Sequence, residues 1–268
     1  MRRPASILLA LACLLLPALP AAAQVDVSLP ADASDRRPTL ALMGTIPIYW
    51  GEVDGMADMF SGGGEPHWAR GEIEREFRLA PLDYLSAEAL AEHDHLLLAQ
   101  PRGLTAEENV ALDAWVRGGG NLLLFADPMM TGHSRFGIGD RRRPQDTILL
   151  SPILTHWGLD LQYDDAQSQG RQERDFRAGK LPVNLPGRFA MLEAAQGRCT
   201  LESDGVVAWC LLDQGMITAV ADGAMLDIED APDGAAEALW RLLVHSMGNL
   251  GEGAATPSVL PPVSTESR

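Results

Sequence analysis

Long apolar runs are missing from residues 24–268, and cysteine is scarce, with three in the 268-residue chain. A membrane-spanning helix needs about 20 consecutive apolar residues, so we expect no transmembrane span after the first segment. Basic residues are also few, because 21 Lys and Arg stand against 37 Asp and Glu and leave a formal net charge of −16. This charge argues against binding nucleic acid or an anionic membrane, since both need a positively charged surface.

The motifs of several enzyme classes are absent as well. The sequence contains no Gly-x-Ser-x-Gly nucleophile elbow, P-loop, Cys-x-x-Cys, His-Glu-x-x-His or Gly-x-Gly-x-x-Gly. We therefore expect no cofactor and no metal site, and the motifs assign no catalytic residue.

The first 23 residues have the three-part layout of a secretory signal peptide. Two arginines precede an apolar core from Ile7 to Leu16, and small residues follow up to Ala23. We expect cleavage before Gln24 and export to the periplasm, with an uncleaved anchor or a lipoprotein at Cys13 as the alternatives. Removing the two arginines of this segment changes the formal charge from −16 to −18.

Cys199 and Cys210 are the cysteines that remain after such cleavage, at the ends of CTLESDGVVAWC. The Ser-Asp-Gly at residues 203–205 predicts a turn between two strands. In an oxidising compartment such a pair favours a structural disulfide, and two buried free thiols are the alternative. No local motif activates either thiol for catalysis.

The apolar pattern predicts one α/β domain over residues 39–250, between a polar lead-in at 24–38 and a disordered tail at 251–268. Its clearest unit is a strand at 95–101, a helix that begins with a Thr105–Glu108 capping box, and a strand at 121–126. Continuous apolar strands joined through a helix indicate a mostly parallel sheet flanked by helices.

The C-terminal part is richer in predicted strands. A polar excursion is expected near residues 162–182, and strands are expected near 188–193, 198–202, 206–212 and 216–221. A final helix over 232–250 buries apolar residues at helical spacing. The predicted fold is therefore α/β with a β-rich C-terminal part.

The segment RGGGNLLLFADP, residues 117–128, carries two different signals. A phosphate-binding glycine loop follows a strand and opens a helix, whereas Gly118–Gly120 follow a helix and precede a strand. The glycines therefore indicate the end of a helix. Asp127 instead follows a strand, so it can contact a ligand, act as a base, or simply open a turn, as Asp-Pro does.

Ligands of open α/β sheets bind at the carboxyl ends of the strands, and polar residues follow three predicted strands here. The candidate ligand-binding residues are Gln100, Arg102, Asp127, Met129, His133 and Asp222. Two other clusters carry weaker signals. Glu92–His95 precedes its strand and indicates a solvated turn rather than a metal site, and Arg141–Arg143 is either a solvated loop or a site for an acidic partner.

Several segments together resemble the auxiliary subunit domain of uncharacterised ABC-type transport systems, a group that includes the GldG-like gliding-motility proteins. The similar motifs, spread over residues 39–250, are Pro101, Thr105–Glu108, Gly118–Gly120, Asp127-Pro128, Leu150–Gly158 and Gly215–Asp222. The resemblance implies a flavodoxin-like or class I glutamine amidotransferase-like fold without demonstrated enzymatic activity. Amidotransferases of that fold place a cysteine in the turn after a strand. The corresponding strand here ends in Asp127-Pro128. We also expect neither the larger size nor the C-terminal membrane anchor of the gliding-type proteins.

The sequence favours an exported, non-enzymatic accessory or ligand-recognition protein of an ABC-type transport system. Its expected partner is a permease or another envelope component, or a glycan or small polar ligand. The rival hypothesis is a periplasmic hydrolase that uses Asp127 and His133 on a polar or carbohydrate substrate. A purely structural envelope protein is the third possibility.

Overall fold

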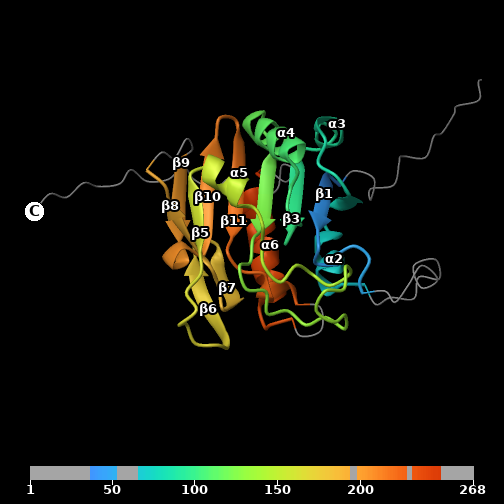
Figure 1. Ribbon diagram of the computed structural model, residues 1–268. Helices are drawn as coiled ribbons and strands as arrows, with labels where there is room; N and C mark the ends of the chain where they lie inside the picture. Colours follow the sequence, from blue (N-terminus) through green and yellow to red (C-terminus); the bar gives the residue numbers. More distant parts are fainter. Residues whose placement is uncertain (1–36, 53–65, 194–197, 228–230, 249–268) are drawn as a thin grey trace, which may run out of the picture. The chain divides into compact units, whose positions relative to one another are not determined.

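The computed structural model describes residues 37–52, 66–193, 198–227 and 231–248 (Figure 1). The expected signal peptide, the lead-in up to residue 36 and the tail at 251–268 lie outside these ranges, so these expectations remain predictions. No helix in the described ranges combines the length and hydrophobicity that a membrane crossing requires.

A seven-stranded mixed sheet forms the centre of the fold, in the order β2-β1-β3-β4-β11-β10-β9. Neighbouring strands from β2 to β11 are parallel, whereas β10 and β9 join the edge antiparallel. The α/β class with a β-rich C-terminal part is therefore confirmed. The strands are β1 (Thr39–Gly44), β2 (Arg78–Pro81), β3 (His95–Ala99), β4 (Asn121–Phe125), β9 (Arg198–Glu202), β10 (Val207–Leu212) and β11 (Gly215–Val220).

Helices cover both faces of this sheet, as Figure 1 shows. The strands bury alternate residues on the two faces, because successive side chains of a strand point in opposite directions. In β1, for example, Leu40 and Leu42 belong to one core, whereas Ala41 and Met43 belong to the other. The first core contains residues of α2 (Trp68–Ile73) and α6 (Ala235–Ser246), and the second contains residues of α3 (Ala87–Leu90), α4 (Ala106–Arg117) and α5 (Ser151–His156).

Two small antiparallel pairs complete the fold. β5 (Leu159–Gln162) pairs with β8 (Arg188–Met191), so β8 lies outside the main sheet. The polar excursion is a hairpin of β6 (Arg171–Phe176) and β7 (Gly179–Asn184). Its second strand buries Leu181 and Val183 in the core, so this hairpin is packed against the domain. The short helix α3 has no counterpart among the predictions, and Ser86 caps its first turn.

The glycines after α4 end that helix, as predicted. Gly119 has a φ of 115°, a conformation that side chains rarely adopt. A Cβ on Gly120 would collide with the Trp115 ring, so this position also excludes a side chain. Both glycines lie between a helix and the amino end of β4, at the opposite end of the strand from Asp127.

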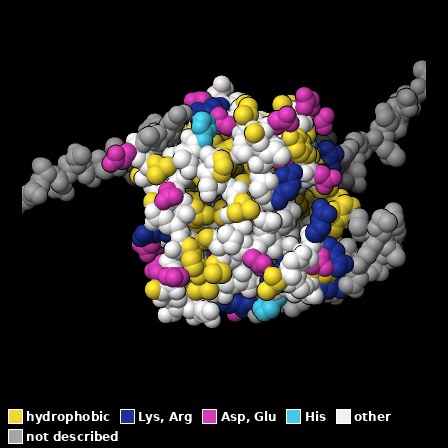
Figure 2. All heavy atoms as spheres, viewed as in Figure 1, with side chains coloured by type: hydrophobic (Ala, Val, Ile, Leu, Met, Phe, Trp, Pro, Cys, Tyr) yellow, Lys and Arg dark blue, Asp and Glu magenta, His cyan; other side chains and the backbone are white. Residues whose placement is uncertain are grey.

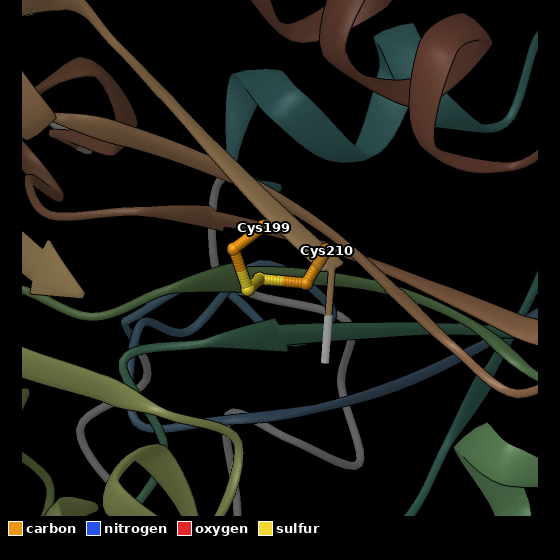
Figure 3. The surroundings of a disulfide bond; sticks show 2 residues. All are labelled: Cys199 and Cys210. Atoms are coloured by element: carbon orange, nitrogen blue, oxygen red, sulfur yellow. A yellow bond between two sulfur atoms is a disulfide. The ribbon is translucent and has the colours of Figure 1, made fainter. Parts of the chain in front are cut away.

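The disulfide between Cys199 and Cys210 is confirmed (Figure 3). The two cysteines are direct partners in the antiparallel pair of β9 and β10, with Cα atoms 4.0 Å apart. The turn that joins the strands contains Ser203, Asp204 and Gly205, all with positive φ. The predicted turn residues therefore allow the close return that brings the two thiols together.

Candidate functional site

Asp127 and Asp222 follow two neighbouring parallel strands, β4 and β11. The last residues of these strands, Phe125 and Val220, are register partners, and each aspartate comes two residues later. The chain thus brings both carboxylates to the carboxyl edge of the sheet, as predicted from the sequence. Both are withdrawn from solvent, with exposed fractions of 0% for Asp127 and 1% for Asp222.

Backbone N–H groups occupy all four oxygens of these carboxylates. Asp127 accepts hydrogen bonds from Met129 N at Oδ1 and Gly223 N at Oδ2, both 2.8 Å long. Asp222 accepts from Ala224 N at 2.8 Å and from Asn184 N at 2.9 Å. The two aspartates therefore tie together the loop after β4, the turn after β11 and the end of β7.

Burial has a clear effect on the ionisation of this pair. Loss of hydration raises the pKa of Asp127 to about 6, although the bonds from Gly223 and Met129 act in the opposite direction. Burial also raises the pKa of Asp222 well above its usual value, and the nearby charge of Asp127 raises it further. Hydrogen bonds to the backbone thus stabilise the charged forms but do not fully replace water.

Gln100 is fully buried at the end of β3 and has a positive φ of 50°. Its side-chain amide donates to Asp127 O at 2.9 Å and to Gln145 O at 3.0 Å, and its Oε1 accepts from Asp127 N at 2.8 Å. Gln100 therefore connects the end of one strand to the loop that follows the next.

The strand order reverses between β1 and β3, which is where open α/β sheets commonly bind ligands. In this chain, Thr45 after β1 and Gln145 on the loop after β4 occupy that position. Thr45 Oγ1 donates to Gln100 O at 2.5 Å and accepts from Gln145 N at 2.9 Å. A Cβ on Gly44 would collide with Ala99 O, so the backbones also approach closely here.

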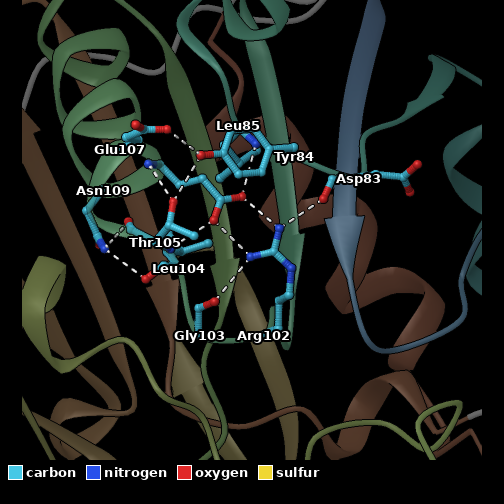
Figure 4. A network of polar contacts seen from close by, with 10 residues as sticks. Asp83, Tyr84, Leu85, Arg102, Gly103, Leu104, Thr105, Glu107 and Asn109 are labelled. Carbon is cyan, nitrogen blue, oxygen red and sulfur yellow. Dashed lines mark hydrogen bonds and ion pairs between the residues drawn. The ribbon is translucent and has the colours of Figure 1, made fainter.

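Arg102 makes a two-pronged ion pair with Glu108, a residue that sequence analysis assigned only to a helix cap. Arg102 Nη2 and Nη1 lie 2.8 and 2.9 Å from the two carboxylate oxygens, which also accept from Thr105 N and Leu85 N. Figure 4 shows Arg102, Thr105 and Leu85 close to one another within this network of polar contacts. Burial alone would raise the pKa of Glu108, but these donors lower it to about 2.

Met129 and His133 are exposed and lie on the long loop after β4. The His133 ring contacts Asp227, with Nδ1 2.8 Å from Oδ2, and the same oxygen accepts from His133 N at 3.2 Å. The hydrolase hypothesis paired His133 with Asp127, whereas the structure gives it a different carboxylate.

Sequence reasoning missed Asp227 and Glu52, which together hold the tip of this loop. Glu52 Oε1 accepts from Ser134 Oγ at 2.5 Å, and its Oε2 accepts from Arg135 N at 3.1 Å. Neither carboxylate belongs to a recognisable motif, and each lies more than 80 positions from its partners, as the separations of 82 and 94 show. No local pattern could have found them.

A surface groove of about 370 Å³ lies elsewhere, lined by Glu72, Arg75, Glu76, Ala236, Glu237 and Trp240. None of the residues predicted from the sequence lines it. Two of its acidic groups have partners, because Glu72 pairs with Arg75 and Glu237 pairs with Arg241. Among the described residues, no group of three or more His, Cys, Asp or Glu could hold a metal ion.

The predicted residues thus fall into three sets. Gln100, Asp127 and Asp222 form a buried network, whereas Met129 and His133 face solvent on the loop which that network supports. Arg102 is partly exposed but belongs to the Glu108 ion pair. The buried network holds the loop after β4 in place. Backbone N–H groups already bind the carboxylate oxygens of Asp127 and Asp222.

The chain is a mixed α/β protein in which side chains and backbone groups of its own loops occupy the carboxyl edge of the sheet. Residues 53–173 match the family described as ABC-type uncharacterized transport system. None of the curated proteins matches the chain in sequence.

Three similar solved structures are each distant from this chain in sequence. An exo-beta-1,4-mannosidase from Opitutaceae bacterium strain TAV5 is 15% identical with a TM-score of 0.44, over 78% of this chain but only 36% of that one. The N-terminal domain of mmIFT52 is 12% identical with a TM-score of 0.46, over 76% of this chain and 97% of that one. A putative ThuA-like protein from Bacteroides uniformis is 10% identical with a TM-score of 0.42, over 80% and 95% of the two chains. These values are too low to transfer a function.

Proposed function

We propose that this chain is an exported, non-enzymatic accessory protein of an ABC-type transport system, which recognises a partner rather than transforming a substrate. The family match over residues 53–173 supports the transport role. That segment contains β3, α4, β4 and the long loop up to α5, so it includes the carboxyl ends of β3 and β4 but not those of β1 and β11.

One observation carries the non-enzymatic part of the proposal. The two aspartates at the carboxyl edge are buried, and backbone N–H groups already occupy their four oxygens. A catalytic base must reach the proton that it removes, and a carboxylate closed off in this way has no path to a substrate. Asp127 and Asp222 accordingly act as supports for the surrounding loops, and recognition occurs on the exposed loop residues, including Met129 and His133.

The proposal also includes a flavodoxin-like fold, a relationship to the GldG-like proteins and a periplasmic location. The parallel strands follow the order 2-1-3-4-5 of flavodoxin-like sheets, with β11 as the fifth strand, which supports that fold and the amidotransferase-like relationship. We place the chain near the GldG-like proteins on its motifs. The signal-like first segment and the disulfide support a periplasmic location, because disulfides persist in oxidising compartments.

Purification from native membranes tests the proposal. A tagged full-length chain is expressed in its own organism, cross-linked in intact cells and purified after membrane solubilisation. Recovery of an ABC-type permease or ATPase subunit, absent from a parallel purification of an unrelated exported protein, is the expected result. Recovery of neither subunit contradicts the transport role.

The hydrolase hypothesis is tested separately. It requires an activity on a polar or carbohydrate substrate that Asp127→Asn abolishes in a folded protein. We expect a broad hydrolase screen to find no such activity, and a turnover lost in that folded variant would replace the proposal.

A further inference from the structure

The groove between α2 and α6 shares no residue with the buried network of Gln100, Asp127 and Asp222. Its volume of about 370 Å³ falls within the range of roughly 300–1,000 Å³ that small-ligand sites occupy. Three lining residues belong to α2 or the turn after it, and three belong to α6; they are Glu72, Arg75, Glu76, Ala236, Glu237 and Trp240. Two elements that lie far apart along the chain thus line one groove.

The rest of the fold holds both elements in place. His67, the N-cap of α2, accepts a hydrogen bond from Ala69 N at 3.1 Å and donates one to Leu226 O at 2.9 Å. Leu239 of α6 is buried in the same core as Ile73 of α2. A ligand therefore meets a groove that is already formed, and its binding costs less conformational entropy.

Trp240 gives the groove a large aromatic surface. This residue is 38% exposed, and no ring or cation in the described part of the chain stacks on its indole. Its N–H group also has no acceptor among the described residues. Tryptophan is enriched among the residues that dominate binding, because its ring buries a large apolar area and its N–H group donates.

The polar groups of the groove keep free acceptors and free donors. Glu72 binds Arg75 through Oε2, and Glu237 binds Arg241 through Oε1. The second oxygen of each carboxylate, and both oxygens of Glu76, accept no hydrogen bond from a residue that the structure describes. Arg75 uses only Nη1 in its ion pair, so its other N–H groups can donate.

Net charge does not decide which ligand fits this groove, because three glutamates accompany Arg75 and the nearby Arg241. Acidic and basic side chains are also mixed over the face of the molecule in Figure 2. A cation would meet Arg75, an anion would meet the glutamates, and an apolar ligand would remove water from the carboxylates without replacing it. A neutral hydroxylated ligand suits the groove, because each hydroxyl group both donates and accepts a hydrogen bond.

We propose that the groove between α2 and α6 binds a pyranose ring of a saccharide. One face of such a ring carries C–H groups, which pack against an aromatic side chain such as Trp240. The ring hydroxyls donate to Glu76 and the neighbouring carboxylates, and they accept from Arg75. The inference goes beyond the transport role and does not depend on it, because the groove lies outside the loop after β4.

Calorimetric titration of the purified full chain with defined sugars tests this site. The probes are cellotriose, maltotriose, triacetylchitotriose and glucose, and sorbitol is the open-chain polyol that lacks the rigid C–H face. We expect at least one trisaccharide to bind with a millimolar or tighter Kd and sorbitol not to bind. Trp240→Ala should weaken the binding by at least ~10-fold through lost stacking, and Glu76→Ala by ~5-fold through lost hydrogen bonds.

Ala236→Phe is a second variant that fills the groove from an exposed position without removing a partner, so it tests the site even if Trp240→Ala fails to fold. The matched controls are Trp50→Ala and Glu92→Ala, which remove an exposed tryptophan and an exposed carboxylate outside the groove. Circular dichroism checks the folding of every variant. Ala236→Phe should abolish binding, and both controls should leave it unchanged.

The proposal is overturned if no trisaccharide binds at millimolar concentration, if sorbitol binds as tightly, or if the controls weaken binding as much as the groove variants. Groove-dependent binding of butylammonium without binding of any trisaccharide would replace it with a cation site. Binding of glucose as tight as that of the trisaccharide would support a free sugar, and weaker binding would support a glycan chain. Because the assay contains no transporter, its outcome is independent of the co-purification experiment.

Discussion

Removing the charge of Glu108 is the clearest test of the packing around the carboxyl edge. Its two oxygens accept four hydrogen bonds, two from Arg102 and one each from Thr105 N and Leu85 N. In Glu108→Gln one oxygen becomes an NH₂ group, which cannot accept. At least two of the four donors then lose their acceptor.

The expected cost follows from this geometry. A buried donor left without an acceptor costs about 1–3 kcal/mol, and breaking a buried ion pair costs about 3–5 kcal/mol. Lowering the pKa of Glu108 from 4.5 to about 2 corresponds to roughly 3 kcal/mol. The Arg102 side chain is 39% exposed, so water partly replaces its lost partner. We therefore expect the free energy of unfolding to fall by about 2 kcal/mol.

Urea unfolding followed by circular dichroism at neutral pH measures this loss, and a decrease in Tm of roughly 4–8 °C should accompany it. The pH dependence has a definite sign. Because the folded pKa of Glu108 lies below its usual value, its stabilising contribution is present above about pH 4.5 and is lost as the pH falls towards 2. The difference between the wild-type chain and Glu108→Gln should shrink over the same range.

Glu107→Gln is the matched control, because Glu107 is the neighbouring exposed residue and accepts one bond from the Tyr84 hydroxyl at 3.1 Å. We expect it to change the free energy of unfolding by less than about 0.5 kcal/mol. The reasoning is refuted if Glu108→Gln is as stable as wild type at neutral pH, or if its deficit persists undiminished at low pH.

Three further predictions concern the buried pair, the disulfide and a packed glycine. Burial raises the folded pKa of Asp127 to about 6, so the contribution of this residue to stability is greatest at low pH and declines as the pH rises through that value. The urea midpoint should therefore change less between about pH 5 and pH 7.5 in Asp127→Asn than in the wild-type chain. Removing the bond between Cys199 and Cys210 by double replacement with Ser should lower the free energy of unfolding by about 3 kcal/mol, because the unfolded chain gains freedom, and calorimetry of both proteins measures this loss. Gly215→Ala should destabilise by about 2 kcal/mol or more in urea unfolding, since its methyl group would collide with carbonyl oxygens.

Each of these predictions has a contrary outcome. An unchanged pH dependence in Asp127→Asn would mean that this carboxyl titrates normally. Equal Tm values before and after reduction of the wild-type disulfide would remove its stabilising role. For the packed glycine, Gly71→Ala on α2 is the control, because the added methyl group would meet no atom within 4 Å beyond its chain neighbours and the helix's own backbone, and alanine favours a helix. A loss as large in that variant would show that glycine replacement is harmful regardless of packing.

Much of the fold was predictable from local patterns. Continuous apolar strands, the Thr105 capping box and the glycines after α4 each act over a few neighbouring residues, so the βαβ unit could be located from the sequence. The pairing of β8 with β5 was not predictable, because it depends on which edge a short strand reaches after the chain has folded. The cysteine pair was predictable because a recognisable turn separates its two strands.

The candidate site was also predictable only in part. Sequence reasoning placed Asp127 and Asp222 at the carboxyl edge, because parallel strands direct their ends the same way. Their hydrogen-bond donors could not be placed in the same way, because Asn184 N lies 38 positions from Asp222 and Gly223 N lies 96 positions from Asp127.

By itself, the sequence determined the α/β class, the cysteine pair and the edge at which the polar residues gather. These features depend on periodicity and turn chemistry, which act between near neighbours. The tertiary structure alone decided that Asp127 supports a loop and that Glu52 and Asp227 clamp it. Those roles depend on burial and on partners that lie far away along the chain. The sequence shows that a residue is an aspartate or a glutamate, but it does not show whether water or backbone N–H groups surround the carboxylate.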